Sequence, residues 1–170
     1  MKAHFSMLAR YNAWANSRLY AHASTLPDEA YRRDVGAYFE SLHATLNHLL
    51  VADRIWMRRL SGTGEHPNAL NAILFEGFAA LRAARVAEDQ RIVDFVERLS
   101  PSDIERELDF QSLKGTPLRQ PVHEVLAHVF NHQTHHRGQA HAILTQVGVE
   151  EPDSLDLLMM LHLEKNTARF

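Results

Sequence analysis

Four long stretches of this sequence repeat apolar residues at the spacing of an amphipathic α-helix, and short segments rich in glycine, proline and serine separate them. The helices are expected at about residues 2–24, 41–60, 75–99 and 121–147. Ser41 is a suitable N-cap for the second helix, and Ser61-Gly62 can end it. Residues 29–40 and 61–71 are expected to be irregular. The pattern predicts an all-α protein built as a four-helix bundle.

Residues 106–120 have a different character. Leu108 and Phe110 come before a Lys114-Gly115 turn, and Leu118 comes after it. Two short apolar runs around such a turn are typical of a β-hairpin. We therefore expect a small hairpin before the last long helix.

Two shorter helical segments complete the predicted fold. Pro101 is suited to the first position of a short helical turn that Ser100 precedes. A C-terminal helix is expected from Asp153 or Ser154 to Leu163. Because the sequence contains no internal repeat and no long linker, we expect one domain over residues 1–170.

The composition argues against several classes of protein. The formal net charge is −3 and no basic run is present, so we expect no nucleic-acid partner. No stretch of about eighteen apolar residues occurs, and the first residues lack the pattern of a signal peptide. We therefore expect no membrane span and a cytoplasmic location. The absence of cysteine excludes disulfides, thiolate ligands and a protein thiol nucleophile.

Histidine is concentrated in the fourth predicted helix, which carries six of the twelve histidines. At about 100° per residue, roughly one third of the helix circumference holds His128, His132, His135, His136 and Gln139. Imidazole is a common ligand of transition metals, and residues four apart on a helix can bind one ion together. The pairs 128/132, 132/136 and 132/135 are all candidate chelators. The stripe predicts half of a metal site.

The other half must come from a second helix, because catalytic zinc sites usually have three protein ligands and a water. His48 is the best candidate. It lies off the leucine stripe of the second helix, next to Ala44 and Ala52, where another helix can approach closely. An alternative interpretation remains open, since a lone histidine on such a face is often a hydrogen-bonded core residue. The whole stripe can likewise form a buried hydrogen-bond network without metal.

Polar residues on the first two helices have simpler explanations. Asp53 lies within the leucine stripe of the second helix, where an unpaired carboxylate would be costly. We expect it to meet an arginine or a helix end. Packing and hydrogen bonding account for Asn12 and Asn16, although either is also a candidate to bind substrate.

Three motifs resemble those of the DinB/YfiT-like superfamily of bacterial four-helix metalloproteins. They are RYNAWAN at Arg10–Asn16, LHATLNHLLVADRIW at Leu42–Trp56 and HVFNHQTHHRGQ at His128–Gln139. With the hairpin, the resemblance covers essentially the whole chain. It implies a four-helix bundle that holds one divalent ion, zinc or nickel, through His48, His132 and His136. It also implies a homodimer.

The resemblance is less specific about the reaction. Related branches include thiol-dependent S-transferases and isomerases and proteins called metal-dependent hydrolases. The implied function is a metal-dependent enzyme of the S-transferase or hydrolase type, acting on a small molecule together with a low-molecular-weight thiol. His135 or His128 is then a candidate general base, because an ordinary imidazole has a pKa near 6.5. The alternative is a non-catalytic metal-binding stress-response protein with a saturated coordination shell.

Overall fold

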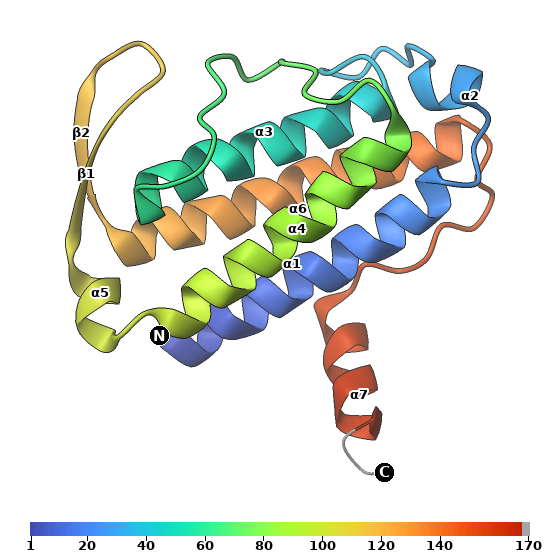
Figure 1. Ribbon diagram of the computed structural model, residues 1–170. Helices are drawn as coiled ribbons and strands as arrows, with labels where there is room; N and C mark the ends of the chain where they lie inside the picture. The colour runs from blue at the N-terminus through green and yellow to red at the C-terminus, as the bar shows by residue number, and fades with distance from the viewer. Residues whose placement is uncertain (168–170) are drawn as a thin grey trace.

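The computed structural model describes residues 1–167 and contains the four long helices that the sequence predicts. They are α1 (Lys2–Ala23), α3 (Leu42–Ser61), α4 (Phe78–Arg98) and α6 (Val122–Gln146). Both α1 and α3 pack against α4 and α6, so the four form a closed bundle (Figure 1). The predicted four-helix bundle is therefore confirmed. The last three residues of the predicted 1–170 domain lie outside the described part. None of the helices in residues 1–167 is long and apolar enough to cross a membrane.

The smaller elements lie at the ends of the bundle, except for the C-terminal helix, which lies beside α1 (Figure 1). They are α2 (Asp28–Arg32), α5 (Pro101–Glu105), β1 (Glu107–Gln111), β2 (Pro117–Pro121) and α7 (Leu157–Thr167). The strands β1 and β2 pair antiparallel, with Phe110 opposite Leu118, and connect α5 to α6. The hairpin prediction is confirmed. The C-terminal helix starts and ends a few residues later than predicted, and it projects away from the bundle (Figure 1).

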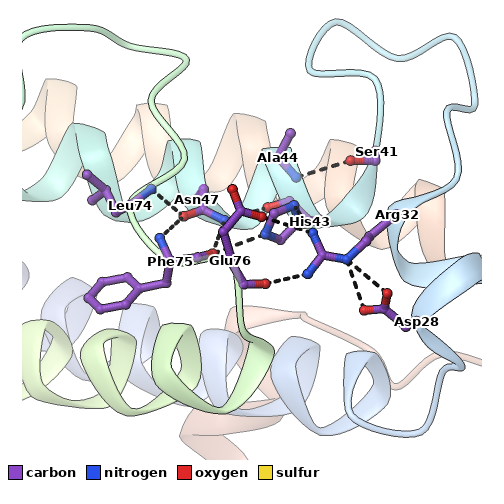
Figure 2. Close-up of polar contacts among 9 residues, drawn as sticks. All are labelled: Asp28, Arg32, Ser41, His43, Ala44, Asn47, Leu74, Phe75 and Glu76. Carbon is purple, nitrogen blue, oxygen red and sulfur yellow. Dashed lines mark hydrogen bonds and ion pairs between the residues drawn. The ribbon is translucent and has the colours of Figure 1, made fainter.

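The predicted start of the third long helix is wrong by three residues, and Asn47 explains the difference. Its Oδ1 accepts hydrogen bonds from the backbone N–H groups of Leu74, at 2.9 Å, and Phe75, at 3.0 Å (Figure 2). Asn47 is completely buried. These bonds hold the loop of residues 62–77 against α3, so α4 begins only at Phe78.

The prediction that residues 29–40 are irregular is also partly wrong. Asp28 lies in the first turn of the short helix α2, where a carboxylate is favourable, and it pairs with Arg32 at 2.9 Å. Figure 2 shows Arg32 reaching from α2 to His43 on α3 and to Glu76 before α4. After α2 the chain folds back on itself, because the Val35 N–H donates to the carbonyl oxygen of Glu40 at 2.9 Å.

A polar layer divides the hydrophobic core into two clusters along the bundle. Asp53 on α3 and Asp89 on α4 both pair with Arg85, at 2.7 and 3.0 Å, and the side chains of all three residues are buried. Asn12 and Asn16 donate to Asp89 from α1. The prediction that Asp53 meets an arginine is confirmed. Asn12 and Asn16 are buried in this layer, and their side-chain amides are hydrogen-bonded within it.

Burial also changes the pKa of the carboxyl groups in the polar layer. It raises the pKa of Asp89 to about 6, although the charge of Arg85 acts in the opposite direction. It also raises the pKa of Asp53. Gln133 on α6 donates to Asp53 at 2.6 Å, so all four long helices contribute to one hydrogen-bonded network.

Candidate metal centre

Three histidines from two neighbouring helices meet in the bundle. His48 on α3 lies with His132 and His136 on α6, and their ligand atoms are all within 4.8 Å of one another. The ring centroid of His136 is 4.4 Å from those of both His48 and His132. The rings of His48 and His132 are 5.2 Å apart. Three imidazoles this close can hold one metal ion.

The hydrogen bonding of His48 leaves one ring nitrogen free for such an ion. Its Nδ1 lies 2.7 Å from the carbonyl oxygen of Leu70, which can only accept, so Nδ1 carries the proton. The Nε2 atom therefore has a lone pair. It is buried and has no hydrogen-bond partner among residues 1–167. A buried unpaired acceptor is costly in a core, and a metal ion would satisfy it.

His136 is oriented in the same way by a side chain. Its Nδ1 lies 2.7 Å from Oε1 of Gln139, which leaves Nε2 as the acceptor. The amide nitrogen of Gln139 lies 3.3 Å from Nε2 of His135. Gln139 thus connects a half-buried histidine to an exposed one. Partners of this kind fix the tautomer and the ring orientation of metal-binding histidines.

The protonation states of His132 and His48 also suit the binding of a cation. Burial, followed by the charges of the other histidines, lowers the pKa of His132 to about 3. Burial lowers the pKa of His48 to about 4. Both rings are therefore neutral near pH 7, which is the form that binds metal.

An aromatic side chain covers part of the cluster. The ring of Phe39 stacks on His48 with a centroid distance of 3.9 Å and an interplanar angle of 21°. It also meets the edge of His136 at 5.5 Å. Phe39 occupies the fold-back of residues 35–40 that precedes α3. Within residues 1–167, the Phe39 ring contacts the rings of His48 and His136 but not that of His132.

A cavity of about 700 Å³ opens beside His132. Its wall comes from α3, the loop of residues 62–77, the hairpin and α6, and it includes His128. The indole of Trp56 meets the edge of His128 at 5.1 Å. Burial and the nearby charge of Arg59 both lower the pKa of His128. This volume is in the range of cavities that bind small organic molecules.

The predicted site residues therefore divide into three groups. His48, His132 and His136 are brought together, as the resemblance implied. His128 lines the cavity beside them. His135 is exposed, is not among the residues that line the cavity, and contacts Gln139.

Sequence reasoning missed Phe39 and Leu70. Phe39 belongs to a segment without periodicity, and Leu70 contributes a backbone carbonyl, which any residue carries. No sequence pattern indicated either contact.

Comparisons with known proteins agree with this architecture. A family model described as the DinB family matches residues 1–168. The curated Protein DinB of Bacillus subtilis (strain 168) is 29% identical over 147 residues, and the match covers 83% of this chain and 84% of the relative. The crystal structure of a DinB-like protein from Bacillus cereus ATCC 10987 matches with a TM-score of 0.64 at 18% identity. That match covers 85% of this chain and 91% of the other, and at this identity it shows the fold alone.

Proposed function

Because this chain belongs to the DinB family, we propose that it is a metal-dependent enzyme whose divalent ion, zinc or nickel, is bound by His48, His132 and His136. The observation that carries the proposal is the unpaired, buried Nε2 of His48 next to two further imidazoles. Three protein ligands with access from one side are typical of catalytic zinc sites. A bound ion would lower the pKa of a water or a thiol at its remaining position.

His128 is proposed as the general base. It lines the same cavity as His132, and its lowered pKa keeps it neutral and able to accept a proton near pH 7. His135 is proposed as a positioning residue. Its Nε2 accepts from Gln139, whose other amide atom orients His136.

The substrate is proposed to react with an external thiol or with water. The chain has no cysteine, so a sulfur nucleophile must come from a low-molecular-weight co-substrate. In thiol transfer, the new carbon–sulfur bond forms as the leaving group departs from the same carbon. His128 takes the thiol proton. In the hydrolytic version a water takes the place of the thiol.

Metal binding and turnover can be measured separately. Protein purified without a histidine tag is stripped with a chelator and titrated with zinc and with nickel. Turnover is then measured with cysteine plus monochlorobimane for thiol transfer, and with p-nitrophenyl acetate for hydrolysis. We expect about one ion per chain and a rate that requires the ion. His128→Ala should retain the ion but lose rate.

The alternative function is a non-catalytic metal-binding stress-response protein. It requires a saturated coordination shell, and the cavity beside His132 argues against it. Full metal uptake with no metal-dependent turnover of either substrate would favour this alternative. Failure to take up zinc or nickel would reject both functions.

A further inference from the structure

The cavity beside the candidate metal centre has an arginine and two aromatic rings in its wall. The Cζ atom of Arg59 lies 4.6 Å from the ring centroid of Trp56 and 5.1 Å from that of Phe110. All three line the cavity, together with His132. Arg59 also donates to the carbonyl oxygen of Gln111 on β1 at 2.8 Å, so it lies where the hairpin meets α3.

Arg59 has no anionic partner within the described residues 1–167. Its Nη2 donates to a backbone carbonyl, and its Nε is buried without a hydrogen-bond partner. Burial lowers the pKa of the guanidinium, yet this group stays charged at any physiological pH. A partly buried cation without a counter-ion is unfavourable unless a ligand supplies the negative charge.

The rest of the cavity suits the apolar part of such a ligand. Ile55, Leu118 and Val125 line it, and the aromatic rings extend the apolar surface. The charged groups in the wall are Arg59 and Lys114 against Glu124, so positive charge is in excess. The lining therefore favours an apolar body with an anionic group.

The spacing of residues on α3 gives the approximate separation between Arg59 and the three histidines. Arg59 follows His48 by eleven residues on α3, which is roughly 16 Å along the helix axis. The guanidinium extends over Trp56, toward the N-terminal end of the helix, as helical side chains do. This reduces the separation from the three histidines to on the order of 10 Å.

We infer that the cavity binds an elongated, mainly apolar small molecule with a carboxylate, which pairs with Arg59 while the opposite end lies next to His132. The inference names a substrate class and, for the reaction at the histidines, rests on the proposed function. Binding itself depends on the cavity and on Arg59. It can therefore be tested without a metal ion.

Calorimetric titration of the chelator-stripped protein with octanoate and n-octanol tests the inference. The stripped form is used because a carboxylate can also bind a metal ion. We expect octanoate to bind more tightly than n-octanol. Arg59→Gln should weaken octanoate binding about ten- to a hundredfold, as for loss of a charge-assisted hydrogen bond, and should leave n-octanol binding unchanged.

Two further variants separate this effect from misfolding. Arg59→Lys keeps the positive charge and should retain most of the octanoate affinity. Arg58→Gln, at an exposed neighbour that does not line this cavity, should bind octanoate like the unaltered protein. Urea unfolding midpoints show whether each variant is folded.

The inference is wrong if the stripped protein does not bind octanoate. It is also wrong if folded Arg59→Gln binds octanoate as tightly as the unaltered protein, or if binding appears only after zinc is added. Because metal uptake is measured in a separate titration, failure of the proposed metal site does not obscure the octanoate result.

Discussion

The Nδ1 atom of His48 lies 2.7 Å from the carbonyl oxygen of Leu70, so a loop backbone group sets the tautomer of a buried side chain on α3. A side-chain substitution cannot remove this carbonyl. It can, however, release the loop. The loop of residues 62–77 is held by the hydrogen bonds of Asn47 to Leu74 and Phe75.

Asn47→Ala should therefore weaken metal binding although Asn47 is not a ligand. Loss of the buried hydrogen bonds should also lower the free energy of unfolding by about 1–3 kcal/mol. Zinc titration and urea unfolding measure the two effects. Asn68→Ala, at an exposed position of the same loop, is the matched control. Equal zinc affinity of the two variants would show that the loop does not orient His48.

His132→Ala should abolish stoichiometric metal binding, because two remaining imidazoles make an incomplete site. The addition of zinc or nickel should raise the melting temperature of the unaltered protein by mass action, and that of this variant much less. His66→Ala changes an exposed histidine and should behave like the unaltered protein. Elemental analysis of both variants checks the assignment, and equal metal content would contradict it.

Gln139 should affect metal affinity through His136. Gln139→Leu removes the acceptor for the Nδ1 proton, and loss of such a partner typically costs about ten- to a hundredfold in affinity. Gln139→Glu keeps an acceptor at this position and should bind zinc at least as well as the unaltered protein. Competition titration with a chromogenic chelator measures both. Similar losses in the two variants would contradict the role of Gln139 as the acceptor for the His136 Nδ1 proton.

His48 and His132 should each make the metal-stripped protein less stable as the pH drops from 6.5 toward 4, whereas Asp89, whose pKa is raised to about 6, contributes with the opposite sign. Unfolded histidines bind protons near pH 6.5, whereas in the folded state the pKa of His48 is about 4 and that of His132 is about 3. At these two histidines the unfolded state therefore binds more protons in this window, and acidification favours it. Each such group changes the free energy of unfolding by at most about 1.4 kcal/mol per pH unit.

His132→Gln tests this origin of the pH dependence. It removes one of the two groups, so its unfolding free energy should depend less steeply on pH than that of the unaltered protein. His4→Gln replaces an exposed histidine and serves as the reference. Urea unfolding of the stripped proteins at several pH values between 4 and 7 supplies the slopes. Identical slopes in all three proteins would place the titrating groups elsewhere.

Much of this fold could be predicted because the buried face of each long helix is visible in the sequence as apolar residues at helical spacing. Ser41 and Gly62 mark the ends of α3, and the structure shows a side-chain cap and a left-handed residue at these two positions. The start of α4 could not be predicted in this way. It depends on hydrogen bonds between Asn47 and residues that are distant in the sequence, and no local sequence pattern indicates these bonds.

The candidate site shows the same division. The histidine spacing on α6 indicated which residues share a face, because a helix has a fixed angular period. The roles of Phe39 and of the Leu70 carbonyl depend on how loops fold back onto α3, and loops have no such period. The sequence also could not predict that His128 and His135 have different surroundings. Both lie on one stripe, but the cavity reaches the first and not the second.

Arg85 should be the residue on which the polar layer depends most. Arg85→Met leaves Asp53 and Asp89 buried without their shared cation, and breaking a buried ion pair typically costs about 3–5 kcal/mol. Protonation relieves this cost, because a neutral carboxyl is cheaper to bury than a carboxylate. The stability deficit of the variant should therefore be smaller at pH 5 than at pH 8. Arg82→Met, at an exposed position on the same helix, should cause little change at either pH. Urea unfolding at the two pH values measures the loss of unfolding free energy in each variant. A loss in Arg85→Met that does not vary with pH would mean that lost packing, rather than unpaired charge, destabilises the bundle.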